Sequence, residues 1–205
     1  MRAVIFAGGS YGDRDFYKKQ LRADDFFIAA DAGCAAAEKM NIRVNVAIGD
    51  FDTLDREKIS ADEIISLNRE KDYTDSAEAV ELAIERGYDE ILLFGGTGSR
   101  LDHTLCNIQL LALAHRQGAA MSLVDEHNIV YITDSSITLK KKAGWHLSVV
   151  QLTDAYGINL SGLYYPLHDK TLLLGDMVGI SNEFTEDEAT VSVGDGIVLV
   201  MLTRD

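Results

Sequence analysis

Short continuous runs of apolar residues alternate with amphipathic segments in the first part of the chain. Such runs are typical of strands covered on both faces, as in a parallel sheet. We predict these strands at residues 3–7, 26–30, 44–48, 64–67, 91–94 and 121–124. Apolar residues also recur with helical spacing in two stripes, at Ala77, Val80 and Ile84 and at Leu101, Leu105, Ile108 and Ala112. The alternation predicts an α/β domain with a mainly parallel sheet, flanking helices and right-handed crossovers.

The pattern changes after about residue 127. Short apolar segments separated by Gly, Asp and Asn follow one another without a helical segment between them, at 129–132, 147–150, 171–174, 190–193 and 197–200. This spacing is typical of an antiparallel β-sandwich or barrel, and we predict a β-sandwich domain. We place the boundary near 127–135 and assign residues 1–130 to the α/β domain and 131–205 to the β-sandwich domain.

The composition is that of an ordinary globular protein, with 47% hydrophobic residues among 205 and a net charge of −14. This acidity disfavours nucleic-acid binding, whereas clustered acids can hold a divalent cation. No apolar run approaches about 18 residues and no signal-peptide pattern is present, so we expect a cytoplasmic protein without a membrane span. Cys34 and Cys106 lack zinc-site spacing and are expected to be free thiols.

Carboxylates follow four successive predicted strands, at the end where ligands bind in open α/β sheets. They are Asp31 after the second strand, Asp50 and Asp52 after the third, Asp72 and Asp75 after the fourth, and Asp102 after the fifth. Converging carboxylates repel one another unless a cation lies among them. Mg²⁺ prefers a few carboxylate oxygens and keeps positions free for water and substrate phosphates. Because Asp50 and Asp52 are two residues apart in a turn, both can reach one ion.

The segment 95–100, with the sequence GGTGSR, precedes a predicted helix. Its backbone N–H groups and the helix N-terminus suit an anion. Arg100 can add a bidentate contact to a phosphate and stabilise the charge that develops during transfer. Together with the carboxylates, this segment predicts a metal-dependent phosphate-transfer site.

Several of these residues also have a purely structural interpretation. Asp75 with Glu78, and Ser99 with Asp102, have the form of a helix cap and its capping-box partner. The carboxylates at 50 and 52 have the form of ordinary turn residues. Familiar signatures are missing, because the chain has no GxxxxGK[ST] P-loop, no complete GxGxxG and no GxSxG. The shared position of the acids, rather than any one residue, therefore supports the hypothesis.

Taken together, these motifs resemble those of the thiamine pyrophosphokinase family. The matching segments follow the family's order along nearly the whole chain, as DAG at 31–33, GDFDT at 49–53, KDYTD at 71–75, GGTGSRLDH at 95–103, GLYYPL at 162–167 and GISNE at 179–183. The resemblance implies an ATP:thiamine diphosphotransferase. Such an enzyme moves the β,γ-diphosphoryl unit of ATP to the hydroxyethyl oxygen of thiamine and yields thiamine diphosphate and AMP. The resemblance also implies a homodimer with thiamine near the subunit interface.

The resemblance assigns roles to residues by matching position. It implies catalytic roles for Asp72, Asp75 and Arg100, with Asp72 orienting or deprotonating the attacking hydroxyl. It implies that Mg²⁺ is the cofactor, held by Asp50, Asp52 and Asp75, and that Ser181 and Asn182 contact thiamine. The residues that it places around ATP are Asp31, Gly33, Gly96, Thr97, Gly98, Arg100, Asp102, His103 and Asn107.

The residues alone leave two other functions open. One is a metal-dependent phosphohydrolase of nucleotides or sugar phosphates, in which the same acids activate water. The other is a non-catalytic binding module that retains a nucleotide pocket. The β domain and its Ser181-Asn182 segment favour the diphosphotransferase.

Overall fold

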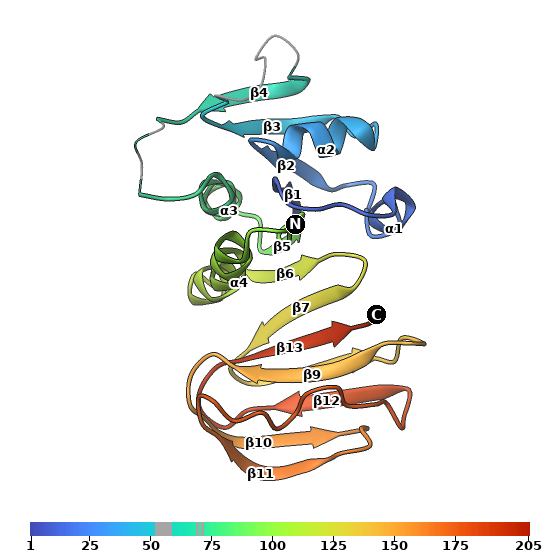
Figure 1. Ribbon diagram of the computed structural model, residues 1–205. Helices are drawn as coiled ribbons and strands as arrows, with labels where there is room; N and C mark the ends of the chain where they lie inside the picture. Colours follow the sequence, from blue (N-terminus) through green and yellow to red (C-terminus); the bar gives the residue numbers. More distant parts are fainter. Residues whose placement is uncertain (52–58, 69, 71) are drawn as a thin grey trace. The chain divides into compact units, whose positions relative to one another are not determined.

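The computed structural model describes residues 1–51, 59–68, 70 and 72–205, and it divides into two compact units (Figure 1). Unit 1 is Met1–Glu126 and unit 2 is His127–Asp205. Unit 1 is an α/β structure and unit 2 consists of antiparallel strands, so the predicted fold class is confirmed. Asp52, one of the expected metal ligands, lies outside the described residues.

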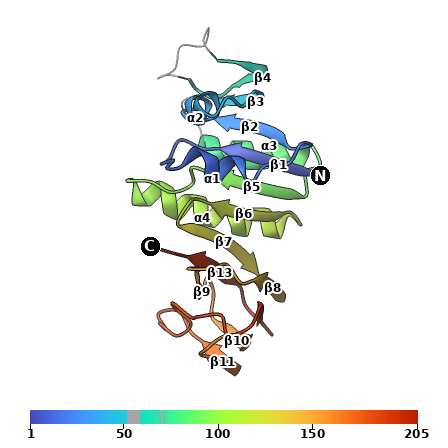
Figure 2. The same ribbon diagram turned by 90° about the vertical axis from the view of Figure 1, so that its right-hand side faces the viewer.

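A parallel sheet with the order β4-β3-β2-β1-β5-β6 forms the centre of unit 1. Its strands are β1 (Arg2–Phe6), β2 (Phe26–Ala30), β3 (Val44–Gly49), β4 (Ala61–Ser66), β5 (Glu90–Phe94) and β6 (Ala120–Val124). Residues 3–6 of β1 are fully buried, as expected for a central strand covered on both faces. Figures 1 and 2 show α1 (Arg14–Lys18) and α2 (Gly33–Lys39) on one face and α3 (Asp75–Glu85) and α4 (Leu101–Arg116) on the other.

The buried face of α4 differs from the predicted stripe. Leu101 and Leu105, two members of that stripe, are 68% and 55% exposed, so the stripe is not the buried face of the helix. The buried residues of α4 are Asn107, Leu110, Leu111, Ala112 and Ala114. The first two turns of the helix border a cavity instead of the sheet, because His103, Thr104 and Asn107 line that cavity. Apolar residues in these turns therefore do not mark the core.

Unit 2, all of which the structure describes, contains two sets of antiparallel strands. In one, β13 (Val198–Thr203) pairs with β7 (Asn128–Thr133) and β9 (His146–Gln151). The other has the order β11 (Leu167–Leu172), β10 (Ala155–Ser161), β12 (Glu188–Ser192) and β8 (Ser136–Lys140). Val149, Val200, Ile158 and Val191 are fully buried, so one face of each set contributes to the core of this unit, as in a sandwich.

Three details of unit 2 depart from the predicted strands. Strands β8 and β10 alternate polar and apolar residues and give no continuous apolar run. The predicted strand at 171–174 was wrong at its end, because the strand stops at Leu172. The amides of Leu173 and Leu174 donate to the carboxylates of Asp176 and Asp154, both at 2.8 Å, and this holds the segment in a turn.

None of the helices in the described part of the chain is both long and apolar enough to cross a membrane.

A buried ion pair lies at the amino end of the unit 1 sheet. The Arg2 guanidinium donates from Nε and Nη2 to the two carboxylate oxygens of Asp25, each at 2.7 Å. Arg2 Nη2 also donates to the carbonyl of Gln20, and the amide of Arg22 donates to Asp25 at 2.7 Å. Removal of either partner leaves a buried charge unpaired, which is costly.

We therefore expect Asp25→Ala to lower the free energy of unfolding by about 3–5 kcal/mol. Urea denaturation of the purified protein measures this change. The exposed pair of Arg43 with Asp62 supplies the control, because Asp62→Ala should cost no more than about 1 kcal/mol. Equal losses for the two variants would show that the Arg2 pair does not stabilise the sheet in this way.

Candidate functional site

A cavity of about 540 Å³ lies at the carboxyl end of the unit 1 sheet. Residues that follow β1, β2 and β5 line it, together with the starts of α3 and α4. The chain runs outward from β1 to β4 on one side and then returns to β5 on the other side of β1. Ligands of open α/β sheets bind at such a reversal of strand order. The volume lies within the range of small-molecule sites.

The three successive carbonyls of segment 95–97 each accept a hydrogen bond from elsewhere in unit 1. Their donors, in chain order, are the Gly9 amide at 2.9 Å, the Asn107 side-chain amide at 2.8 Å and the Ser10 amide at 2.7 Å. In a trans peptide the C=O and the following N–H point in opposite directions. Each of the N–H groups of 96–98 therefore points away from the donor that holds the preceding carbonyl, and residues 96–98 line the cavity together with the three donor residues. Backbone amides of a glycine-rich segment at the start of a helix are donors of the kind that suit a phosphate.

Close packing holds this segment against the loop that follows β1. A Cβ on Gly9 would lie 2.2 Å from the Thr97 carbonyl oxygen and 2.3 Å from that of Gly95, so no side chain fits there. The hydroxyl of Tyr11 donates to the Ala7 carbonyl at 2.8 Å. Burial, followed by the neighbouring Tyr17, raises the pKa of Tyr11 well above its ordinary value, and the phenol therefore remains a donor.

Arg100 supplies a cation at the edge of the cavity. Its Nε and Nη2 donate to Asp102 at 3.2 and 2.6 Å, and both side chains are exposed. The bond from Arg100, followed by that from the His103 amide, lowers the pKa of Asp102 to about 2, so this carboxylate is ionised near neutral pH. Arg100 is the N-cap of α4 and makes no side-chain cap bond, so the interpretation of Ser99 as the cap was wrong.

Asp75 lines the cavity from the first residue of α3. The cap of this helix is Thr74, whose hydroxyl accepts a hydrogen bond from the Ala77 amide at 3.2 Å. The interpretation of Asp75 and Glu78 as a capping box is therefore wrong, and the Asp75 carboxylate is not the cap of the helix. Its negative charge in the first turn is still favourable with the helix dipole.

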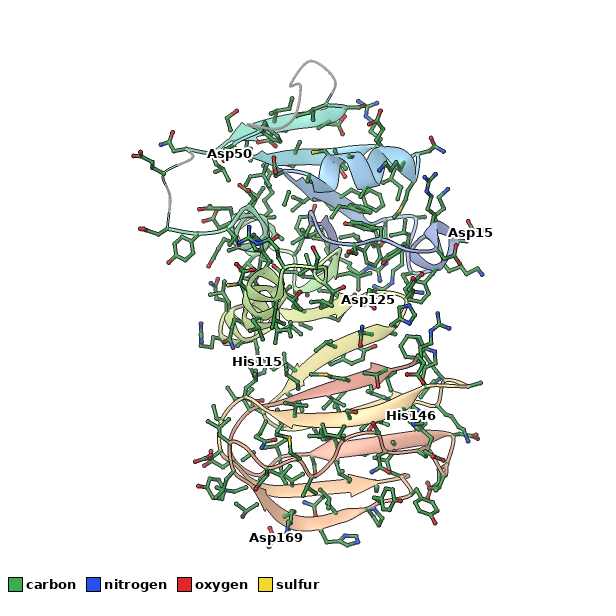
Figure 3. All side chains as sticks on the ribbon, in the orientation of Figure 1. Asp15, Asp50, His115, Asp125, His146 and Asp169 are labelled. Atoms are coloured by element: carbon green, nitrogen blue, oxygen red, sulfur yellow. The ribbon has the colours of Figure 1, made fainter. Side chains whose placement is uncertain are left out.

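Asp31 lines the cavity from the end of β2. Its amide donates to the Ile48 carbonyl at 2.9 Å, and a Cβ on Gly49 would lie 3.2 Å from the Asp31 Cβ. The ends of β2 and β3 are therefore in contact, and Asp50 follows directly at the end of β3 (Figure 3). Acids from two strand ends and from α3 thus come to the same edge of the sheet.

No three His, Cys, Asp or Glu side chains among the described residues are grouped closely enough to hold one metal ion. Because Asp52 lies outside those residues, the ligand set of Asp50, Asp52 and Asp75 stays a prediction. The acidic side chains at this edge are carboxylates, the oxygen donors that Mg²⁺ prefers. Mg²⁺ is usually bound by one or two carboxylates together with substrate phosphates, so the donor set fits this ion without a complete protein cluster.

Four expected site residues of unit 1 are not among the described residues that line the cavity, namely Gly33, Asp50, Asp72 and Asp102. Gly33 has a packing role, since a Cβ there would lie 1.9 Å from the Phe6 carbonyl oxygen. The sequence interpretation also missed lining residues, namely those of segment 8–10 after β1. The Gly-Gly-Ser sequence that ends the first apolar run was the available signal.

Cys34 lies three residues after Asp31, but its thiol is not in the thiolate form that nucleophilic catalysis requires. Burial, and then the charge of Asp31, raises the pKa of the Cys34 thiol to about 11. The group is therefore protonated near neutral pH. A thiolate nucleophile at this edge of the sheet is disfavoured.

The residues expected to contact thiamine lie in unit 2. The Ser181 amide donates to the Ser148 hydroxyl at 2.9 Å. Asn182 is 1% exposed. Its Oδ1 accepts from the amides of Tyr165 and Glu183 at 2.9 and 3.0 Å, and its Nδ2 donates to the Tyr165 carbonyl at 2.8 Å. Asn182 therefore fixes the backbone at Tyr165, whose ring is exposed beside that of Tyr164.

Two family models match the chain. The model described as "Thiamin pyrophosphokinase, catalytic domain" matches residues 17–123, and "Thiamin pyrophosphokinase, vitamin B1 binding domain" matches residues 134–198. The thiamine pyrophosphokinase of Bacillus subtilis (strain 168) is 31% identical over 187 residues, which cover 87% of each chain. The sequence matches thus extend over both units.

Solved structures of thiamine pyrophosphokinases have the same fold. That from Bacillus subtilis superposes with a TM-score of 0.90 at 26% identity and covers 100% of both chains. That from Geobacillus thermodenitrificans has a TM-score of 0.87 at 27% identity, covering 100% of this chain and 98% of the other. The enzyme from Candida albicans shares only the fold, with 13% identity, a TM-score of 0.81 and coverage of 98% and 88%. Sequence and fold agree, and the chain belongs to the thiamin pyrophosphokinase family.

Proposed function

We propose that the unit 1 cavity is the ATP site of this ATP:thiamine diphosphotransferase. The enzyme transfers the diphosphoryl group of ATP to the hydroxyl of thiamine and forms thiamine diphosphate and AMP. The observation that supports this location is the lining of the cavity, in which the glycine-rich segment 95–98 lies with Arg100 and has its three carbonyls at 95–97 held by hydrogen bonds. The family matches give no support to the phosphohydrolase alternative.

The phosphates of ATP lie, in this proposal, on the amides of 96–98 and against Arg100. The Arg100 guanidinium already binds two oxygens of Asp102, and a phosphate offers the same bidentate geometry. Because the Arg100–Asp102 pair is exposed, a phosphate can replace the carboxylate without the desolvation of a buried charge. Asn107 acts through Gly96 by holding its carbonyl, and Gly33 acts by close packing.

The transfer itself forms a bond between the thiamine hydroxyl oxygen and the β-phosphorus while the bond from that phosphorus to the AMP oxygen breaks. We assign Asp72 to orient the hydroxyl and take its proton. We assign Asp50, Asp52 and Asp75 to hold Mg²⁺, which when bound would neutralise charge on the phosphates. Arg100 offsets the negative charge that develops on the phosphate oxygens.

Thiamine binding is assigned to unit 2, which contains the vitamin B1 binding match. Ser181 remains the proposed contact, whereas Asn182 acts by fixing Tyr165, because its own amide is already bonded to backbone groups. The acidic chain suits the cationic thiazolium ring. We also propose a homodimer, supported by the exposed apolar side chains of Leu174, Met177 and Ile180, and a cytoplasmic location, in accord with the free cysteines.

The reaction can be tested directly. Purified protein with Mg²⁺, ATP and thiamine should form AMP and thiamine diphosphate in equal amounts, as measured by chromatography. ATP labelled on its γ-phosphate should pass its label to thiamine diphosphate, because the β,γ unit moves intact. Omission of thiamine is the control. Phosphate release that does not depend on thiamine would identify a phosphohydrolase and contradict the proposed reaction.

The role of Asp75 predicts a loss of turnover without a loss of fold. We expect Asp75→Asn to lower kcat by at least about 100-fold, because charge compensation at the phosphates is lost. The melting temperature should change by no more than about 2 °C, since Thr74 caps α3. Glu78→Gln removes the same charge from the same helix at a residue that is not among the described cavity-lining residues, and it should retain activity. Equal activities of the two variants would argue against a catalytic Asp75.

A further inference from the structure

Asp125 is a buried carboxylate at the end of β6 (Figure 3). It is 6% exposed, and it is not among the described residues that line the cavity. Its Oδ2 accepts a hydrogen bond from the Thr97 hydroxyl at 2.7 Å. A buried carboxylate is costly unless it is hydrogen-bonded, and a negative charge near a phosphate site is unfavourable. The position of Asp125 next to segment 95–98 therefore needs a specific reason.

The bond to Asp125 determines what Thr97 can offer a ligand. The Thr97 hydroxyl is the donor to Asp125 Oδ2, so its single proton is committed to this bond. The hydroxyl therefore cannot donate to a phosphate in this arrangement. The Thr97 carbonyl is also occupied, by the Ser10 amide at 2.7 Å. Thr97 can therefore offer an anion its backbone N–H, and it also orients the N–H of Gly98.

The neighbouring carboxylate, Glu126, supports the loop after β1, against which segment 95–97 packs. Glu126 Oε2 accepts from the Asp13 amide at 2.7 Å, in the loop after β1. A Cβ on Gly12 would lie 2.0 Å from Glu126 Oε1, so this carboxylate packs directly on that loop. Adjacent residues at the end of β6 thus hold the two loops that meet in the Ser10–Thr97 hydrogen bond.

We propose that Asp125 is a positioning residue for ATP, which through the Thr97 hydroxyl keeps the amides of 97 and 98 directed at the phosphates. This inference rests on the proposed ATP site. Without the bond, the Thr97 side chain is free to rotate and no longer restrains the backbone at Thr97, which keeps the bond from the Ser10 amide to its carbonyl. Only the binding of the ATP phosphates is weakened, so recognition of thiamine in unit 2 is unaffected.

Thr97→Val tests the bond, because it removes the hydroxyl and keeps the branched shape. We expect the KM for ATP to rise about tenfold, with the KM for thiamine unchanged within about twofold. Thr97→Ser keeps the hydroxyl and should restore the wild-type value. Asp125→Ala should raise the KM for ATP at least as much as Thr97→Val does, and the double variant should be no worse than Asp125→Ala, since the Thr97–Asp125 bond is already absent in each single variant. In equilibrium binding, the double variant should weaken a non-hydrolysable ATP analogue but not adenosine.

Asp25→Asn is the matched control for lost stability, since it alters a buried carboxylate at the amino end of the same sheet. It should lower the melting temperature and leave the KM for ATP within about twofold. Equal rises in both KM values for Thr97→Val, or additive losses in the double variant, would overturn the positioning role.

Arg100→Ala separates this inference from the proposed ATP site. If Arg100→Ala weakens the ATP analogue while Thr97→Val does not, only the role of Asp125 is wrong. If Arg100→Ala leaves the affinity unchanged, the ATP site is misplaced and the inference fails with it.

Discussion

The hydrogen bonds that occupy the carbonyls of 95–97 are the constraint on which the rest of unit 1 depends. The bonds from Gly9 and Ser10 form because β1 and β5 are paired neighbours, with Phe6 opposite Phe94, so the loops after these strands leave the sheet side by side, and the third bond comes from Asn107 of α4. Glycine at position 9 lets the two backbones approach closely enough to bond. The proposed anion site depends on that contact, since each carbonyl held by a donor directs the next N–H away from that donor.

An acidic protein that binds a polyphosphate must separate its own charge from that of the ligand. The chain carries a net charge of −14, yet amides and the Arg100 cation surround the proposed phosphate position. Asp125 is buried behind the segment and hydrogen-bonded, so its charge does not line the cavity. Asp31 and Asp75 do line it, where Mg²⁺ would offset their charge. The charged groups around the proposed phosphate position thus suit an anion, although the net charge of the chain is negative.

The buried ion pair and the proposed ATP site occupy opposite ends of the unit 1 sheet. The amino end contains the buried pair of Arg2 and Asp25, which is satisfied within the protein. The carboxyl end contains exposed loops, the left-handed backbone of Asp31 and a cavity. Unit 2 fixes an exposed loop by similar means, with the buried Asn182 amide bonded to the backbone of Tyr165. In both units, buried polar side chains hold backbone segments whose exposed parts are available to ligands.

The sequence alone determined the α/β and β division, the parallel strands of unit 1 and the delivery of carboxylates to one edge, because burial and strand direction leave a periodic trace in the chain. It also determined the family, through motifs at those strand ends. Only the tertiary structure decided that Thr74 rather than Asp75 caps α3, that Asn107 belongs to the buried face of α4, and that Asp125 bonds Thr97. These outcomes depend on which loops the strand order brings into contact. Thr97 and Asp125 are 28 positions apart, so no local sequence pattern predicts their hydrogen bond.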